Sequence, residues 1–557
     1  MVLMARPQSS MHLILLLLCV GLAGSAFGLA DPEAEVTRVF VFAGQSNMVG
    51  SDSDAADIER FPPFAGLDAP QSKVRFSYVI GRETKIRSDG WVDLQPVNGV
   101  VGPELSFARK VSARTSAPIA IIKVAAGGTH LGGDWNPDEP AGFEMYPLLL
   151  ETVRSSLAAL DAKGVRYRLE GLMWHQGEND MFDDGYMAAY GDNLANFLKC
   201  LRRDLEAPEL RAYIGELCTK TIWGMDLRTS MAAIARGQRA VTQADPLAEY
   251  VRTSHVGVEI GGGAGLHYHY GTLGQLEHGV NYADAYLAHL GLGDEPSKPL
   301  KRWPIGKGKT VELYVLAGHR NMEGERAFVQ DLASVKGGKQ LAKANTKIPY
   351  RYSLGGGAKV SDAWEALAPA GPYDTFGPEV SFGAKLASKA RKPIAIAKFT
   401  HSGSQIIDWT PQGSEAKERN LYPDFLAFVQ ASIADLEQRG HTVHLAGIVY
   451  HVGENDMSYP PFREQAAEGI AAFVQQSRQD LVLPELKWFV SQQPPTDHES
   501  VNGIDVIADV ASMAAADEHC IHQVVSDLPD QDKALVIDTA GIVWLGRWLA
   551  EQVLEQD

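Results

Sequence analysis

Short apolar runs alternate with longer amphipathic stretches over most of the chain, and this alternation occurs twice. The runs are rich in β-branched residues and almost free of polar ones, which is typical of strands buried on both faces of a parallel sheet. Stretches such as ELSFARKVSA and MAAYGDNLANFLKCLRRDL separate the runs and have helical spacing. The pattern predicts an α/β fold with a central parallel sheet between two helical layers. The expected strands are 38–43, 119–125, 169–175 and 211–217, then 312–317, 394–399, 444–451, 486–491 and 522–526.

The two halves also share short motifs in the same order. VFAGQSNMVG (41–50) returns as VLAGHRNMEG (315–324), VGPELSFA as FGPEVSFG, GGDWNP as IIDWTP, and HQGENDM as HVGENDM. The offsets are 274, 275, 274 and 276 residues, and YGTLGQLEHG resembles IDTAGIVWLG at 267. Self-similarity at a nearly fixed spacing indicates a tandem duplication of one unit.

The boundary between the repeats is marked by composition. Residues 291–310, GLGDEPSKPLKRWPIGKGKT, are rich in Gly, Pro and Lys, which favours a solvated connection between domains. We therefore expect a first domain at 31–292, a linker at 293–310 and a second domain at 311–557. A chain of this length is expected to form more than one core.

The first thirty residues are expected to be a secretory signal peptide. A basic start with Arg6, the apolar run LILLLLCVGLAG and a small-residue exit precede Asp31. Cleavage is expected near Ala26 or Ala30, which predicts a secreted or periplasmic protein. The apolar run is too short to span a bilayer comfortably, so no membrane association is expected after cleavage.

Net charge limits the kinds of partner that are expected, and the cysteine content limits the number of disulfides. The formal net charge is −18, which becomes −19 when Arg6 leaves with the signal, and this argues against nucleic acid as a partner. Three cysteines follow the signal: Cys200, Cys218 and Cys520. They are too sparse for a disulfide scaffold, although a Cys200–Cys218 bridge is one alternative.

Comparison of the two repeats separates shared residues from residues that only the first repeat has. Glycines, Asn47, the DW pair, His175 and the END segment that contains Glu178 recur in both, which favours a role in folding. Three polar residues do not recur, because Arg320, Val452 and Val536 stand opposite Ser46, Gln176 and His269. A hydroxyl, an amide donor and an imidazole are the groups that acyl transfer needs. The comparison predicts an enzyme repeat beside a degenerate pseudo-enzyme repeat.

The motifs GQSNM, GPELSFA and HQGEND, with the late His-containing segment, resemble the SGNH-hydrolase superfamily. The branch that they resemble holds sialate O-acetylesterases and carbohydrate esterase family six acetylxylan esterases. The resemblance implies a flavodoxin-like three-layer α/β/α sandwich in each repeat. It also implies that Ser46 is the nucleophile and His269 the general base. The implied oxyanion hole consists of the Ser46 and Gly102 backbone N–H groups and the Gln176 side chain.

One feature of that family is missing. Its members carry Asp-x-x-His before the last helix, where the Asp orients the imidazole, but the residue three before His269 is Leu266. If His267 were the base, the corresponding residue would be Ala264. Candidates for the orienting or supporting role are therefore Glu259, His267 and Glu178, an acid from another loop, or a backbone carbonyl.

The sequence thus predicts an exported serine esterase that removes O-acetyl groups from a carbohydrate, with no cofactor. A zinc site of His255, His267 and His269 is not expected, because the segment offers no nearby Cys or Asp. The alternative is a catalytically inactive glycan-binding or scaffolding protein, which the missing Asp favours. The sequence does not determine the sugar, the acyl group or the oligomeric state.

Overall fold

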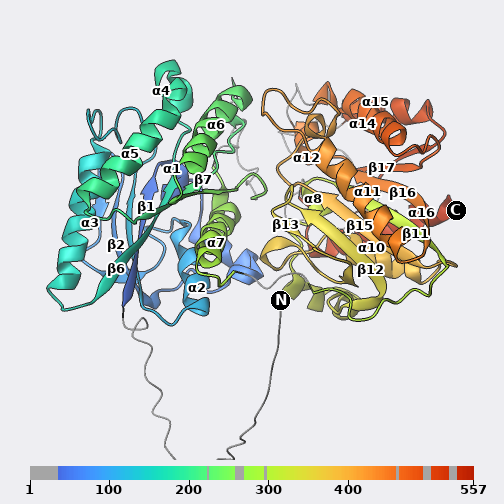
Figure 1. The fold of residues 1–557 in the computed structure, drawn as a ribbon, viewed down its shortest axis with the longest axis horizontal. Helices are drawn as coiled ribbons and strands as arrows, with labels where there is room; N and C mark the ends of the chain where they lie inside the picture. Colours follow the sequence, from blue (N-terminus) through green and yellow to red (C-terminus); the bar gives the residue numbers. More distant parts are fainter. Residues whose placement is uncertain are drawn as a thin grey trace, which may run out of the picture.

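The computed structural model describes residues 36–222, 225–256, 269–293, 298–458, 463–493, 504–525, 528 and 536–556. Within these residues the chain forms two eight-stranded sheets, each mostly parallel and covered by helices on both faces, which confirms the predicted fold class. The two sandwiches lie side by side, and α6 (Arg228–Ala244) and α7 (Gly271–His289) of the first face the second (Figure 1).

The first sheet is centred on β1 (Thr37–Gly44), which pairs in parallel with β5 (Ile119–Ala125) and β6 (Tyr167–His175). The strand order is β10-β7-β6-β1-β5-β2-β3, with β4 on β2, and only β3 and β4 run antiparallel to β2. The carboxyl ends of β1, β5 and β6 therefore meet at one edge, where ligand sites of such sheets form. The remaining strands are β2 (Gln71–Ile80), β3 (Ile86–Arg87), β4 (Val92–Leu94), β7 (Arg211–Gly215) and β10 (Ala248–Val251).

The second sheet has the same strand arrangement as the first, with β11 in the place of β1 and β18 in the place of β10. Its order is β13-β12-β15-β11-β16-β17-β18, with β14 on β12. A register irregularity between Val39 and Phe40 recurs between Leu313 and Tyr314. Duplication is thus visible in the pairing as well as in the motifs. The strands are β11 (Thr310–Gly318), β12 (Asn345–Leu354), β13 (Lys359–Val360), β14 (Glu365–Leu367), β15 (Ile394–Thr400), β16 (Thr442–His451), β17 (Trp488–Gln492) and β18 (Cys520–Val524).

Each sheet has one hydrophobic core on each face. In the first repeat α3 (Met145–Asp161), α5 (Tyr190–Asp204) and α6 cover one face, while α2 (Glu104–Arg114) and α7 cover the other. The second repeat uses its corresponding helices in the same way. Those helices are α11 (Tyr422–Gln438), α14 (Ala466–Asp480) and α15 (Ile504–Ala515) on one face, and α10 (Glu379–Ala387) and α16 (Thr539–Glu555) on the other.

Each expected strand coincides with an observed one within a few residues at its ends. Strands β2 and β12 were not expected, because polar residues interrupt QSKVRFSYVI and NTKIPYRYSL where the strands begin. Cys200, Cys218 and Cys520 are buried free thiols, so the alternative of a Cys200–Cys218 bridge is wrong. None of the described helices combines the length and the hydropathy needed to cross a bilayer.

Candidate active site

Ser46 lies in a tight turn at the carboxyl end of β1. The strand ends at Gly44, whose φ of +152° and contact with the His175 carbonyl oxygen leave no space for a side chain. Ser46 then begins the short helix α1 (Ser46–Val49) and is 8% exposed. Gly127, in the loop after β5, lies against it, because a Cβ added there would be 3.5 Å from Ser46 Cβ. The hydroxyl-bearing residue therefore lies where the loops of two neighbouring strands converge.

The segment that carries His269 is bonded directly to the Ser46 turn. Asn47 Oδ1 accepts the backbone N–H of Tyr270 at 3.2 Å, which places His269 beside the Ser46 turn. The Thr272 hydroxyl accepts the N–H of Asp54 at 2.9 Å and lies 3.1 Å from its carbonyl oxygen. Residues that follow His269 and Ser46 are thus held together by backbone and side-chain bonds, although the two segments are far apart in the sequence.

The carboxylate that the sequence motif lacks is supplied by Asp52. Its Oδ2 lies 2.6 Å from His269 Nδ1, and the two residues are 217 positions apart in the chain. Asp52 has a φ of +60°, a left-handed conformation that Asp tolerates better than most residues. The His269 side chain is 11% exposed and that of Asp52 is 59% exposed. A carboxylate at Nδ1 fixes the tautomer that leaves Nε2 able to accept a proton.

Gln176 lies in a buried network behind the turn. Its Nε2 donates to Gln45 Oε1 at 3.2 Å, to the Thr129 carbonyl oxygen at 3.0 Å and to Asp180 Oδ2 at 2.5 Å. All three partners are acceptors, which fixes the orientation of the amide. Burial raises the pKa of Asp180, and the bonds from Leu131, Gln176 and Gly132 oppose this only in part. The amide of Gln176 thus has protein partners already, and its contribution to an oxyanion hole stays a prediction.

Replacement of Gln176 by valine, the residue at this place in the second repeat, is expected to destabilise the protein by about 1–3 kcal/mol. The change leaves Asp180 and the Thr129 carbonyl as buried acceptors without that donor. Urea unfolding of the variant measures the loss. Gln475→Val, an exposed position on α14, is the matched control and should change little. An unfolding free energy equal to that of wild type would contradict the placement of this side chain.

Gly102 is held against the Ser46 turn by a buried ion pair. Lys123 Nζ lies 2.8 Å from both carboxylate oxygens of Glu104 and donates to the Val49 carbonyl oxygen at 3.2 Å. A Cβ on Gly102 would lie 2.3 Å from Lys123 Nζ and from Glu104 Oε2. A side chain at this position would displace the ends of both ion-pair side chains, and the pair fixes the 102–104 loop to the end of α1.

Glu178 is a buried carboxylate that contacts Asn47 and His175 beside the Ser46 turn. Its Oε1 accepts from Asn47 Nδ2 at 2.5 Å and lies 3.5 Å from His175 Nε2. Burial raises the pKa of this carboxyl, but the bonds from His175 and Asn47 outweigh that effect and the pKa lies below the ordinary value. Glu178 therefore supports Asn47. The other two candidates for orienting the imidazole, Glu259 and His267, lie outside the described residues.

The second repeat has the same backbone without the chemical groups. Asn321 Oδ1 accepts the N–H of Ile537 at 2.8 Å, as Asn47 accepts that of Tyr270, so Val536 occupies the position of His269. Arg320 begins the short helix α8 (Arg320–Glu323) just as Ser46 begins α1. The position of Asp52 is taken by Arg326. Asp52 is thus a fourth polar residue that only the first repeat has.

Arg320 forms a buried bidentate ion pair with Glu325. Its Nε and one terminal nitrogen each lie 2.7 Å from a Glu325 oxygen, and the two side chains are 5% and 4% exposed. The first repeat covers this edge, because the Ser402 hydroxyl donates to the His255 carbonyl oxygen at 2.7 Å. The site of the second repeat is therefore filled by a salt bridge and by the neighbouring domain.

Arg320→Met is expected to lower the free energy of unfolding by about 3–5 kcal/mol, because it leaves the Glu325 carboxylate buried without this partner. Chemical unfolding followed by circular dichroism measures the loss. The double variant Arg320→Met/Glu325→Leu should recover most of it. Lys385→Met, which removes the exposed pair with Glu551, is the control and should cost less than about 1 kcal/mol. An Arg320 variant no less stable than that control would contradict this account.

Among the described residues no group of three His, Cys, Asp or Glu side chains is arranged to hold a metal ion. What the site does contain is a hydroxyl, an imidazole with a carboxylate partner, and backbone N–H groups around one strand end. This arrangement is suited to nucleophilic acyl transfer.

Comparison with known proteins identifies the class. The profile of the family described as carbohydrate esterase, sialic acid-specific acetylesterase matches residues 36–288 and again 310–555. A probable carbohydrate esterase of Arabidopsis thaliana is 28% identical over 186 residues, which are 31% of this chain and 66% of that protein. The solved structure of NanS aligns with a TM-score of 0.35 at 16% identity, over 46% of this chain and 98% of that one. A carbohydrate acetylesterase from Xanthomonas citri aligns with a TM-score of 0.33 at 18% identity, over 44% of this chain and 57% of that one.

The profile places the protein among carboxylic ester hydrolases of carbohydrates. More narrowly, the chain belongs to the sialic acid-specific acetylesterase family of carbohydrate esterases, and it carries that domain twice. The resemblance stated from the motifs is thereby confirmed.

Proposed function

We propose that the protein is an exported serine esterase that removes O-acetyl groups from a carbohydrate through an acyl-enzyme on Ser46. The observation that carries the proposal is the junction of the two segments: Asn47 binds the backbone beside His269, and Asp52 binds the His269 ring. Export rests on the composition of residues 1–30, which lie outside the described part of the chain.

In the proposed reaction His269 accepts the proton of Ser46 as the hydroxyl oxygen attacks the ester carbonyl carbon. The tetrahedral oxyanion is stabilised by the backbone N–H groups of Ser46 and Gly102, with Gln176 as a third candidate donor. The intermediate collapses, His269 gives the proton to the leaving sugar alcohol, and the acetyl group stays on the Ser46 oxygen. A water molecule, deprotonated by His269, then releases acetate.

The second repeat is proposed to perform no ester chemistry. Arg320, Val452 and Val536 replace the nucleophile, the amide and the base, and Arg320 is paired with Glu325. Glycan binding without catalysis was the alternative for the whole chain, and the absence of an orienting Asp motivated it. Asp52 supplies such a carboxylate in the first repeat, so we retain the esterase as the proposed function.

Acetate release tests the proposal. The chain without residues 1–30 is incubated with an aryl acetate, with an O-acetylated oligosaccharide and with an N-acetylated one. We expect acetate from the first two substrates and none from the third. An amine is a much poorer leaving group than an alcohol, so an amide is harder to cleave than an ester. Acetate release no faster than in buffer alone would contradict the esterase.

A further inference from the structure

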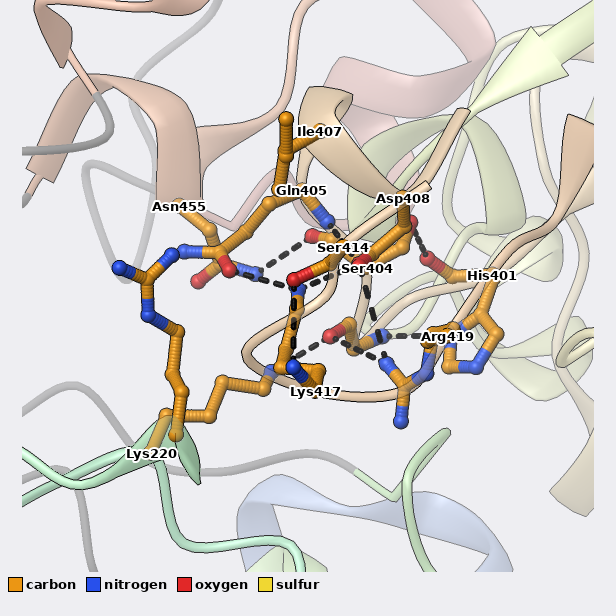
Figure 2. Close-up of polar contacts among 12 residues, drawn as sticks. Lys220, His401, Ser404, Gln405, Ile407, Asp408, Ser414, Lys417, Arg419 and Asn455 are labelled. Atoms are coloured by element: carbon orange, nitrogen blue, oxygen red, sulfur yellow. Dashed lines mark hydrogen bonds and ion pairs between the residues drawn. The ribbon is translucent and has the colours of Figure 1, made fainter. Parts of the chain in front are cut away.

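Three cationic side chains meet at the junction between the two repeats (Figure 2). Lys220 comes from the first repeat, just before the small hairpin of β8 (Thr221–Ile222) and β9 (Met225–Asp226). Lys417 and Arg419 come from the second repeat, in the loop between the 3₁₀ turn at Ile406–Trp409 and α11. Their side chains converge on the carboxyl edge of the second sheet.

Lys417 is completely buried. Its Nζ donates to Gln405 Oε1 at 2.7 Å and to Asp408 Oδ2 at 2.5 Å, and both side chains of the ion pair are 0% exposed. Arg419 Nη1 lies 3.9 Å from the same Asp408 oxygen. A single carboxylate therefore faces two cations.

Lys220 and Arg419 share one neutral acceptor. Lys220 Nζ donates to the Gly403 carbonyl oxygen at 2.5 Å, and Arg419 Nη1 donates to it at 3.3 Å. Gln405 Nε2 is a further buried donor and Asp408 Oδ1 a buried acceptor, and neither has a hydrogen-bond partner in the described part of the chain. The cluster thus presents more donors than acceptors.

Charge is not balanced among the described residues of this cluster. Burial lowers the pKa of Lys417 to about 7 and that of Lys220 to about 8, so at pH 7 Lys417 keeps only part of its positive charge while Lys220 stays mostly protonated. Burial also raises the pKa of Asp456 to about 8, so this neighbour carries little negative charge at pH 7. Burial lowers the pKa of His401 well below its ordinary value, so that ring is neutral. Buried cations without compensating anions are costly, and a bound anion would offset that cost.

Other acidic side chains around the cluster have partners of their own. Glu418 binds Arg236 and Arg239 across the junction. Asp226 binds Arg228 through both carboxylate oxygens. Glu216 accepts the backbone N–H groups of Thr253 and Ser254. These contacts leave Asp408 as the carboxylate that directly contacts two of the three cations, Lys417 and Arg419.

The fold itself does not require these cations, as the first repeat shows. Asp134 and Asp408 occupy equivalent places, because each carbonyl oxygen accepts the backbone N–H at the start of the next helix at 2.7 Å. Asp134, however, accepts the backbone N–H groups of His130 and Phe143. Ala141 and Phe143 stand where the second repeat has Lys417 and Arg419. The second repeat therefore has two positive charges that its equivalent lacks.

A cavity of about 820 Å³ adjoins the cluster. Its size lies in the range of sites for small organic ligands. Arg419 lies in its wall together with other polar side chains, which are Arg228, Gln412, Ser414, Glu415, Glu418, Asn420 and Gln465. Of the two carboxylates in the wall, Glu418 is paired with Arg236 and Arg239, and Glu415 is exposed. A ligand in the cavity would meet the guanidinium, which is suited to binding carboxylate, sulfate or phosphate.

We propose that the junction is a binding site for an oxyanion carried by a small organic ligand, with Arg419 and Lys220 as its charged donors. The ligand would join the two repeats, because Lys220 belongs to one and Arg419 to the other. This inference does not depend on ester hydrolysis by the first repeat.

Thermal unfolding and titration calorimetry test the site at constant ionic strength. The probes are phosphate, sulfate and glucuronate, with chloride and glucose as controls. We expect at least one oxyanion to raise the unfolding temperature, because ligands that bind the native state stabilise it. Glucose should not raise it. A response to glucuronate alone assigns a carboxylate, and a response to phosphate or sulfate assigns a tetrahedral oxyanion. No response beyond that to chloride would overturn the proposal.

Variants locate the binding. Arg419→Met and Lys220→Met are each expected to weaken oxyanion binding about tenfold or more, the effect of losing one charge-assisted bond. Arg236→Met removes an exposed ion pair across the same junction and should leave the affinity near that of wild type. Equal affinity in all three variants would overturn the proposal.

Gln405→Glu keeps the test decisive if the methionine variants do not fold. The change places a carboxylate among the three cations, in contact with Lys417. We expect this variant to unfold at a higher temperature than wild type without any oxyanion and to lose the response to oxyanions. A variant that is less stable than wild type and still binds the oxyanion would contradict the proposed site.

Discussion

Ser46→Ala is expected to lower kcat for ester hydrolysis by roughly 10⁴- to 10⁶-fold, while the fold is retained. Removal of a serine nucleophile has effects of this size, because the remaining site only binds and polarises the ester. Ser46 is 8% exposed, and alanine differs from serine only by the loss of the hydroxyl, so alanine fits the same place. Initial rates with an aryl acetate, together with the unfolding temperature, measure both properties.

Ser51→Ala is the matched control. Ser51 lies five residues further along the same loop and is half-buried, yet it has no part in the proposed reaction. Its rate should stay close to that of wild type. A Ser46 variant that hydrolyses the ester as fast as the Ser51 variant would remove the proposed nucleophile.

Asp52→Asn is expected to lower kcat by about 10²- to 10⁴-fold with KM little changed. The amide cannot stabilise the imidazolium that forms in the transition state, and it can bind the wrong tautomer of the ring. The Asp52 side chain is 59% exposed, so the free energy of unfolding should stay within about 0.5 kcal/mol of wild type. Loss of kcat without loss of stability distinguishes a positioning role from a structural one.

Two further variants support the reading of the Asp52 result. Asp57→Asn changes a neighbouring carboxylate that pairs with Arg60 on the surface, and its kcat should be normal. Asp52→Glu should restore part of the activity, because it keeps the charge while moving it. Full kcat in Asp52→Asn would show that another group orients His269.

The fold class could be predicted from the sequence because the buried parallel strands consist of uninterrupted apolar runs. The two copies also fixed the equivalence of His269 and Val536, which the matching bonds from Asn47 and Asn321 confirm. That equivalence was predicted from the five-residue spacing of His269 to Gly274 in α7 and of Val536 to Gly541 in α16.

The role of Asp52 was not found from the sequence because the family pattern directed attention to residues just before His269. The contact instead joins residues 217 positions apart, through a loop that turns at a left-handed Asp. One signal was available, since Arg326 stands opposite Asp52 just as Arg320 stands opposite Ser46. The junction cluster gave no such signal, because Lys220 and Arg419 meet only through packing of one repeat on the other.

The central claim is that one serine in the first repeat carries the acyl group and that the second repeat carries none. A fluorophosphonate forms a stable adduct with an activated serine, and peptide mass mapping locates it. We predict one adduct per chain, on the peptide that contains Ser46, with its rate of formation strongly reduced in Asp52→Asn. An unmodified Ser46 peptide in a chain that hydrolyses the ester, or an adduct within residues 311–556, would contradict the account.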